Sequence, residues 1–282
     1  MSIKIVSDSA CDLPDGMAEK YGITIVPLYI TMCGKSYLDM IDISRDEFYQ
    51  RLPSCDEVPT TAAPSPEAFR SVYKKLALAG ASQIISIHIS TNLSRTIDSA
   101  HEAAATTEQV PVTVVDSTQL SLGAGYVVMA AAQAAAQGKS LEEILTIIED
   151  ISKRTYVFAA LDTLHYLSKS GRMHVALARV GTILRIKPLL KMNQGNPEVE
   201  RVRTTEGSIR RLLHLVNELG PLEKLSLVHT FAYERIAVLY QRAKDLFPVS
   251  DTQVDIVSVT PVLGCHLGPG VIGFTAIKKE SR

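Results

Sequence analysis

The stretch with the clearest chemical potential is ISTNLSRT, at residues 89–96. The apolar segment QIISIHI leads into it and predicts a buried strand, and IDSAHEAAA after it predicts a helix. The joint between them carries several hydroxyl side chains and one cation, Arg95. Simple helix capping explains such a joint if the Ser94 hydroxyl accepts a backbone N–H. An anion site explains it equally well, because a helix N-terminus has free N–H groups and partial positive charge.

Two further segments place polar side chains beside turns. PTTAAPSP contains Thr60 and Thr61 just before a predicted helix start, so Thr61 either meets solvent or faces the same site as Ser94. LHYLSKSGRM places Lys169 and Arg172 around a glycine. These cations are typical of a solvated helix end, and they are also suited to meeting an anion or a partner protein.

The segment GCHLGPGVIG surrounds His266 with glycines. Glycine allows close backbone approach or a positive φ, so the segment predicts a loop with the histidine at its mouth. Three interpretations of that histidine stay open: it makes a local hydrogen bond within the turn, donates to a carboxylate, or acts as the base for a serine nucleophile. The GxSxG elbow and the phosphate-binding glycine motifs are absent from the sequence.

Composition narrows the class of protein. The 282 residues include 29 basic and 30 acidic side chains, for a net charge of -1, which argues against a nucleic-acid binder. No apolar run has transmembrane length and the start lacks a signal-peptide pattern, so we expect a cytoplasmic protein. The cysteines and histidines show no metal-ligand spacing, so we expect no metal and reduced thiols at Cys11, Cys33, Cys55 and Cys265.

The order of predicted elements gives the fold class. The first half alternates strand and helix, which is typical of a parallel sheet with helices on both faces. After about Arg154 short strands outnumber helices, which predicts a mixed sheet. We therefore predict two α/β domains, an N-terminal parallel α/β/α domain at 1–153 and a C-terminal mixed-sheet domain at 154–282.

Local patterns within these domains predict individual segments and the location of the site. Residues 23–31 are predicted as one strand, 34–43 as an excursion or a short hairpin, and 56–66 as a loop. The apolar run at 175–180 is predicted to be core. Three strands of the first half end in polar residues, at Ser7–Ser9, Ser90–Ser94 and Asp116–Ser117. Ligands of open parallel sheets bind beyond the carboxyl ends of the strands, so we expect the site there.

Taken together, seven segments resemble the DegV family from one end of the chain to the other. In chain order they are DSACDLP, TTAAPSPEAF, SIHISTNLSRTIDSA, VVDSTQLSLGAG, LHYLSKSGRM, LRIKPLL and CHLGPGVIGF. The resemblance implies a two-domain α/β protein that binds one long-chain fatty acid between its domains and needs no other cofactor. Better-understood members are the binding subunits of bacterial fatty acid kinase. They present the carboxylate to a separate kinase catalytic subunit, which makes an acyl-phosphate for phospholipid synthesis.

The resemblance also implies site residues. It places the carboxylate between Thr61 and Ser94, His266 close to the head group, and Arg172 near the mouth, where a partner would dock. The implied partners are the fatty acid, the kinase subunit and at most a transient membrane surface, with no nucleic acid. The C-terminal domain is expected to cover the acyl chain. Burial of each methylene stabilises the complex by roughly 0.8 kcal/mol, so the head group needs only a few hydrogen bonds.

Two departures from the family pattern bear on the head group. Arg95 stands where the family usually has glycine, and its side chain is expected either to point to solvent or to reach the head group as a cation. Ala62 and Ala63 replace the usual serine and glutamine. Two other functions stay open: an esterase with Ser94 as nucleophile and His266 as base, and a regulatory lipid sensor without a kinase.

Overall fold

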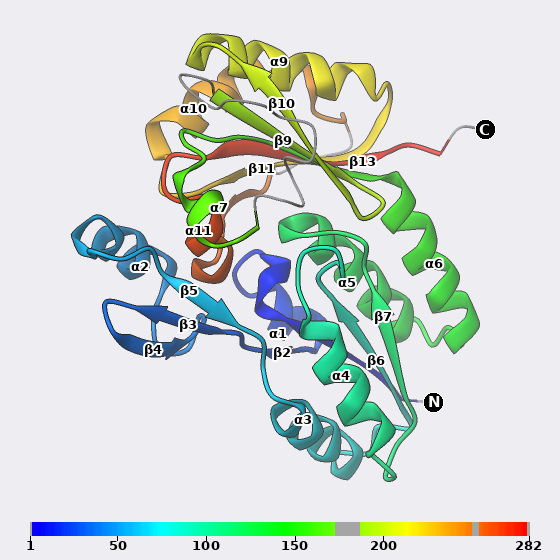
Figure 1. Ribbon diagram of the computed structural model, residues 1–282. Coiled ribbons are helices and arrows are strands. Elements are labelled where there is room, and N and C mark those ends of the chain that lie inside the picture. Colours follow the sequence, from blue (N-terminus) through cyan, green and yellow to red (C-terminus); the bar gives the residue numbers. More distant parts are fainter. Residues whose placement is uncertain (1, 173–186, 250–253, 281–282) are drawn as a thin grey trace.

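The chain folds into two stacked halves and a small sheet at their side. This computed structural model describes residues 2–172, 187–249 and 254–280. Within them lie a four-stranded sheet, a six-stranded sheet and a three-stranded sheet. Figure 1 shows the six-stranded sheet above, the four-stranded sheet below and the three-stranded sheet projecting from one side. The predicted α/β fold, with a parallel sheet in the first half and a mixed sheet in the second, is confirmed.

The four-stranded sheet is entirely parallel. In spatial order its strands are β2 (Ile23–Val26), β1 (Ile3–Asp8), β6 (Gln83–His88) and β7 (Val112–Asp116). The chain leaves β1 toward β2 on one side and returns to β6 on the other, so the strand order reverses between β1 and β6. A crevice opens beyond the carboxyl ends of the strands at such a reversal. The segments after β1 and β6 are therefore placed to line a site.

Helices cover both faces of this sheet. They are α1 (Met17–Tyr21), α3 (Pro66–Leu78), α4 (Thr96–Ala105) and α5 (Ser121–Ala136), and α6 (Leu141–Arg154) packs against α5. Helices α3 and α4 pack together on the outer face, whereas α1 and α5 contact β2 from the inner face. The predicted start of α3 is confirmed, since the Ser65 hydroxyl accepts the Ala68 N–H at 3.3 Å. Ser140 begins α6 with a reciprocal capping box.

The six-stranded sheet belongs to the second half of the chain. Its spatial order is β10 (Asn196–Val202), β9 (Lys187–Asn193), β8 (Thr155–Ala160), β13 (Ile272–Lys278), β11 (Leu222–His229) and β12 (Ile256–Ser258). All neighbours are antiparallel except β11 and β12. The outer face is covered by α9 (Thr205–Glu218) and α10 (Tyr233–Arg242), followed by a 3-10 turn, η3 (Lys244–Leu246).

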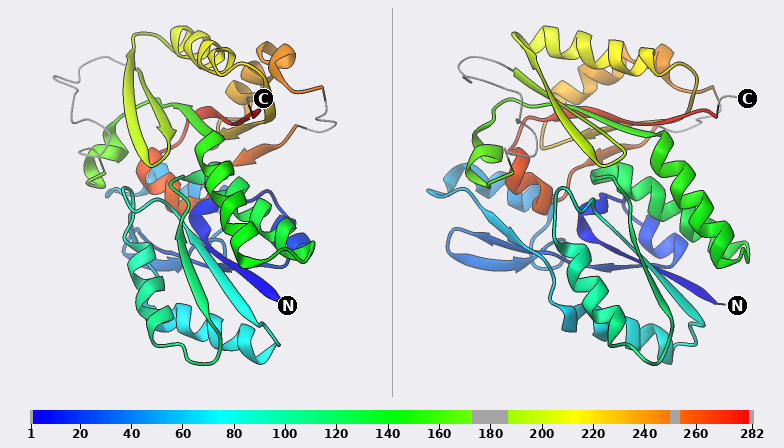
Figure 2. Two further views of the ribbon diagram at one scale, coloured as in Figure 1. Left: turned by 90° about the vertical axis from the view of Figure 1, so that its right-hand side faces the viewer. Right: turned by 45° about the vertical axis from the view of Figure 1, so that its right-hand side comes forward.

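The largest apolar cluster lies between the two sheets. Helix α5 runs through this layer and contacts β1 on one side and β8 and β13 on the other, as Figures 1 and 2 show. Two short helices, α7 (His165–Lys169) and α11 (Pro261–Leu267), and the 3-10 turn η1 (Ser9–Cys11) occupy the same layer. Helix α6 ends at Arg154 and β8 begins at Thr155, next to the predicted domain boundary at 153, which stays a prediction. The apolar run at 175–180 lies outside the described residues.

The small sheet, defined as β3, β4 and β5, corrects two predictions. Its strands are β4 (Lys35–Leu38), β3 (Tyr29–Met32) and β5 (Thr60–Ala62), all antiparallel. The single strand predicted at 23–31 is wrong, because the chain leaves the parallel sheet after Val26 and Pro27 carries no N–H for a continuing ladder. The predicted loop at 56–66 contains β5. The excursion or short hairpin predicted at 34–43 has different bounds in the structure: the observed hairpin is β3–β4, which starts at Tyr29, so only its second strand lies in that range.

The small sheet is joined to the helical segment that follows it. This segment is α2 (Arg45–Arg51) with a 3-10 turn, η2 (Leu52–Ser54). Cys33 and Cys55 form a disulfide with a Cα–Cα distance of 5.4 Å. The expectation of four reduced thiols is therefore wrong for this pair and holds for Cys11 and Cys265, which are free and buried. The turn at Cys33 and the end of η2 are brought together by the folding of β3, β4 and α2, which spacing alone does not reveal.

Candidate functional site

The polar segments singled out in the sequence converge between the two halves of the molecule. ISTNLSRT follows β6 and therefore leaves the sheet at the strand-order reversal. Thr61 comes from β5, where it pairs with Ile30 of β3. His266 comes from α11 and Arg172 from the segment after α7. Four of the five predicted side chains, Thr61, Ser94, His266 and Arg172, line one cavity, and Arg95 does not.

This interdomain cavity is predominantly apolar. Its walls come from the loop after β6, from β8 and β9 of the mixed sheet, and from α11. The apolar lining includes Leu28, Ile89, Leu93, Val157, Leu167, Leu190, Met192, Val228, Val259, Val262, Leu263 and Val271. The polar side chains are few by comparison. An apolar space with a small polar group is the usual design of a site for a largely apolar ligand.

His266 and Thr61 form the central polar contact. The His266 Nε2 and Thr61 Oγ1 atoms are 3.1 Å apart. Burial, with a smaller contribution from the charge of Arg172, lowers the pKa of His266 to about 4, so the ring is neutral near pH 7. Its Nδ1 is buried and has no hydrogen-bond partner among the described residues. Leaving a buried ring nitrogen unpaired costs free energy, which a polar ligand atom or a water can recover.

The segment that carries His266 is a helix rather than the predicted loop. Residues 261–267 form α11, and the glycine-rich turn comes after it. Gly268 has φ +70°, and a Cβ there would collide with the ring of Tyr166. The close approach of this ring packs α7 against the end of α11. The glycines therefore fix the position of the helix end that holds His266, and that helix end lies against the cavity.

Ser94 is held by its own helix start. Its hydroxyl accepts the Thr96 N–H at 3.2 Å and lies 2.8 Å from the Thr96 hydroxyl oxygen. This bond spans two residues rather than one turn, and α4 has Arg95 as its N-cap with no side-chain cap, so the capping interpretation is not met as predicted. The Ser94 side chain also lines the cavity. Among the described contacts, the partner of His266 is Thr61 rather than Ser94. A serine nucleophile would need a direct or water-mediated contact with its base and an acid on the other ring nitrogen.

The two arginines differ in placement. Arg172 is half-buried at the cavity, and its Nε donates to the Leu93 carbonyl at 3.2 Å. This bond ties the segment after α7 to the loop after β6. Arg95 instead has a side chain that is 87% exposed and pairs with Asp98 on α4. Of the two expected orientations, Arg95 takes the one toward solvent, and the expectation that places it beside a head group is not met.

Two carboxylates that were not predicted from the sequence hold α11 in place. Asp12 accepts the Thr260 N–H at 2.8 Å and the Ser121 hydroxyl, so it joins the starts of α11 and α5. Asp39 accepts the Val262 N–H at 3.3 Å. Burial raises the pKa of Asp12, and burial together with the charge of Asp12 raises that of Asp39 to about 7. The DSACDLP segment was a signal for Asp12, whereas Asp39 lies in a hairpin with no motif.

A second buried network fixes the loop after β6. The Asp8 carboxylate lies 2.9 Å from His88 Nδ1 and accepts the Ile89 N–H at 3.1 Å. His88 Nε2 lies 2.8 Å from the Ser86 hydroxyl, which also accepts the Tyr73 hydroxyl at 2.9 Å. All four side chains are buried with at most 1% exposure, so the network has no open face for a ligand. It serves to hold the ends of β1 and β6 in register.

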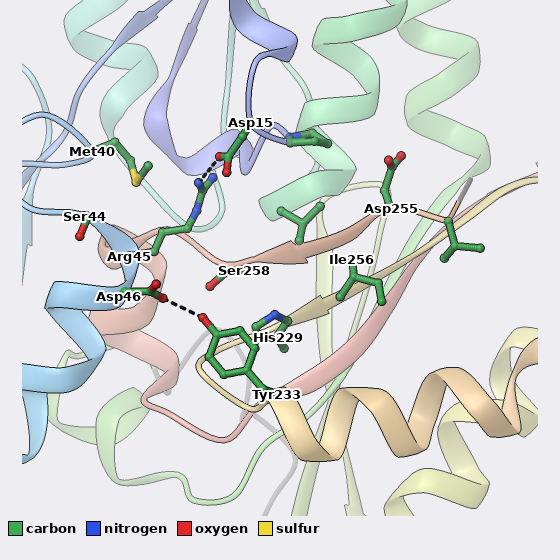
Figure 3. A pocket seen from close by; sticks show the side chains of 13 residues that line it. Asp15, Met40, Ser44, Arg45, Asp46, His229, Tyr233, Asp255, Ile256 and Ser258 are labelled. Carbon is green, nitrogen blue, oxygen red and sulfur yellow. Dashed lines mark hydrogen bonds and ion pairs between the residues drawn. The ribbon is translucent and has the colours of Figure 1, made fainter. Parts of the chain in front are cut away.

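A second cavity, of about 700 Å³, lies between β12 and α2 (Figure 3). Arg45 pairs with Asp15 at 2.7 Å, and the Tyr233 hydroxyl donates to Asp46 at 2.7 Å. Asp255, a further wall residue, pairs with Lys224 at 2.9 Å. The carboxylates around this space outnumber its single guanidinium. It is therefore poorly suited to an anionic head group, and the apolar interdomain cavity is the better candidate.

The described residues hold neither a metal-binding cluster nor a membrane-spanning helix. They contain no group of three or more histidine, cysteine or acidic side chains arranged to hold a metal ion. Within the same ranges, each helix is too short or too polar to cross a bilayer.

Fold and site together define a class: a two-domain α/β protein with an apolar cavity between its domains and a hydroxyl and imidazole group on its wall. Residues 2–279 match the sequence profile described as "Uncharacterised protein, DegV family". The chain belongs to the DegV family. A DegV domain-containing protein of Streptomyces coelicolor is 35% identical over 275 residues, 96% of each chain.

Solved structures give the same result. A DegV family protein from Thermus thermophilus, described as fatty-acid-binding, is 32% identical with a TM-score of 0.89, over 99% of this chain and 100% of its own. A stearic-acid-binding protein from Eubacterium ventriosum is 27% identical with a TM-score of 0.85, over 98% of each chain.

Proposed function

We propose that this protein binds one long-chain fatty acid in the interdomain cavity, with the carboxylate between Thr61 and Ser94 beside His266. The observation that carries the proposal is the combination of an extended apolar lining with this small polar group. Fatty-acid binding by the Thermus thermophilus and Eubacterium ventriosum relatives supports it. Burial of about fifteen methylenes at roughly 0.8 kcal/mol each favours binding by about 12 kcal/mol before ordering costs.

The polar group suits a carboxylate that must later leave. Hydroxyl groups donate hydrogen bonds to the anion without a neutralising charge in direct contact. The neutral ring of His266 can donate from one nitrogen only, so it adds direction rather than charge. The positive charge of Arg172 attracts an anion from the cavity wall while its Nε remains bonded to Leu93. These features stabilise the anion moderately, which permits turnover.

From this follows the second part of the proposal, that the protein is a cytoplasmic carrier which presents the carboxylate to a separate kinase subunit for acyl-phosphate formation. The protein itself then contributes binding and orientation, with no catalytic step of its own. Arg172 is the residue we assign to partner docking near the mouth. The motif resemblance to the binding subunits of fatty acid kinase supports this role.

Lipid extraction and mass spectrometry of the purified protein test the first part. We expect one long-chain fatty acid per chain, and stoichiometric uptake of oleate or palmitate by delipidated protein. Ser94→Ala should weaken that uptake. Absence of any fatty acid, together with no uptake of either added acid, would overturn the proposal.

Reconstitution with a fatty acid kinase catalytic subunit and ATP tests the second part. Acyl-phosphate can be trapped with hydroxylamine as the hydroxamate, and we expect it only when both proteins and ATP are present. Ligand binding without phosphorylation would instead favour a regulatory lipid sensor. Labelling of Ser94 by an active-site serine probe, with ester hydrolysis, would favour the esterase.

A further inference from the structure

The disulfide lies at the open end of the strand pair that carries Thr61. Strand β5 has only three residues and is held in register by β3, with Thr31 opposite Thr60 and Ile30 opposite Thr61. Beyond the Thr31–Thr60 pair, β3 reaches its turn at Cys33, and the chain that leads into β5 starts at Cys55. The bond between these cysteines therefore closes the end of the pair at Thr60, one residue before Thr61.

Buried side chains and a hydrogen bond hold the rest of the small sheet, whereas β5 is held by its pairing with β3, by its contacts with α11 and by this bond. Ile30 and Met32 of β3 are buried, and Arg51 of α2 donates to the Tyr37 hydroxyl of β4 at 2.8 Å. By contrast, Thr60 and Ala62 are exposed and Thr61 is half-buried. A three-residue edge strand with little buried side chain has low local stability. Without the disulfide, we expect β5 to detach more often while β3, β4 and α2 stay folded.

The two bonded cysteines are also the accessible ones. Cys33 is exposed and Cys55 is half-buried. Burial raises the pKa of the Cys11 and Cys265 thiols, both of which are fully covered, so these stay protonated and unreactive. Reagents that exchange with thiols therefore reach the pair and spare the other cysteines.

We propose that Cys33 and Cys55 form a reversible redox site that controls the affinity of the Thr61 site for fatty acid. The site reacts with low-molecular-weight disulfides and thiols. In oxidation, the two thiols and one small disulfide give the Cys33–Cys55 disulfide and two small thiols. The two electrons and two protons pass to the released thiols, and reduction is the reverse reaction.

The physical link is a change in the population of the binding-competent form. When β5 is attached, the Thr61 hydroxyl lies at His266 and lines the cavity. When β5 detaches, this hydroxyl can no longer form a hydrogen bond with the ligand. The apparent dissociation constant rises in inverse proportion to the attached fraction. The inference rests on the proposed function, because fatty-acid affinity is its readout.

The experiment compares full-length protein oxidised with excess glutathione disulfide and reduced with dithiothreitol. Intact mass after alkylation should show two blocked thiols in the reduced form only, and peptide mapping should place them at Cys33 and Cys55. Oleate titration by calorimetry should give a dissociation constant about threefold or more higher for the reduced form, which corresponds to an attached fraction of about one third or less.

The double variant Cys33→Ser, Cys55→Ser is the matched control. It should bind oleate with the affinity of the reduced protein, and dithiothreitol should have no effect on it. Equal affinity of the oxidised and reduced wild-type forms would overturn the inference while leaving the proposed function intact. Failure of the pair to form a disulfide with glutathione disulfide would overturn it as well. Absence of oleate binding in both redox states would instead overturn the proposed function.

Discussion

Replacement of Thr61 by valine is the sharpest test of the carboxylate site. The substitution keeps the branched shape and removes one hydroxyl, which in the structure lies 3.1 Å from His266 Nε2. Valine favours strands at least as well as threonine, so β5 should be retained. The variant therefore isolates the loss of one hydrogen-bonding group from the proposed head-group position.

The expected loss follows from the strength of hydrogen bonds to charged groups. Such a bond contributes about 1.5–3 kcal/mol, and each 1.4 kcal/mol is a factor of ten, so oleate affinity should fall by about 10- to 100-fold. Calorimetric titration of delipidated protein at pH 7.5 measures this change. The methyl ester of oleate, which lacks the anionic carboxylate, should lose much less affinity than oleate does.

Thr60→Val is the matched control for this measurement. Thr60 is the neighbouring residue of β5, points to the opposite side of the strand and is exposed. We expect its affinity for oleate to stay within about twofold of wild type. If Thr61→Val also binds oleate within twofold of wild type, Thr61 does not hold the carboxylate and the proposed head-group position is wrong.

Three predictions concern stability, measured by urea unfolding of ligand-free protein. The pKa of His266 is lowered to about 4, so between pH 6.5 and 4 the unfolded chain binds a proton that the folded chain does not bind. The free energy of unfolding should therefore fall by up to about 3 kcal/mol as the pH is lowered through this range. His266→Gln should remove most of this pH dependence. The pKa of Asp39 is raised to about 7, so between pH 4 and 7 the folded chain binds more protons and this group lowers stability as pH rises. Asp39→Asn should remove that dependence, and an unchanged profile would contradict the assigned burial. Reduction of the disulfide, which spans 22 residues, should lower the free energy of unfolding by about 3 kcal/mol; a change below 0.5 kcal/mol would show that the bond does not restrain the unfolded chain.

Much of the fold and part of the site could be predicted because they depend on local pattern. The helix starts at Ser65 and Ser140 have capping signatures that act within one turn. Ser94 could be placed because polar residues after a buried strand lie at the sheet edge where ligands bind. Thr61, His266 and Arg172 needed the family resemblance, since their partners are remote in sequence.

What escaped prediction depends on contacts between distant segments. The three-residue strand β5 exists only through its pairing with β3, so its sequence resembles a loop. The break at Pro27 marks a change of sheet that the apolar pattern of 23–31 conceals. Asp39 acquires its role only when the start of α11 is packed against the hairpin. For β5 and for Asp39 the deciding partner lies more than twenty residues away.

The interdomain cavity is bordered by residues of the largest apolar cluster, among them Leu28, Val228 and Val262. A bound acyl chain would therefore complete the interior of the protein as well as being its cargo. Its concentration then enters the folding equilibrium directly: free ligand at one hundred times its dissociation constant adds about 2.7 kcal/mol. Loaded molecules would outlast empty ones under proteolysis. The lifetime of the protein would thus report on the supply of its ligand.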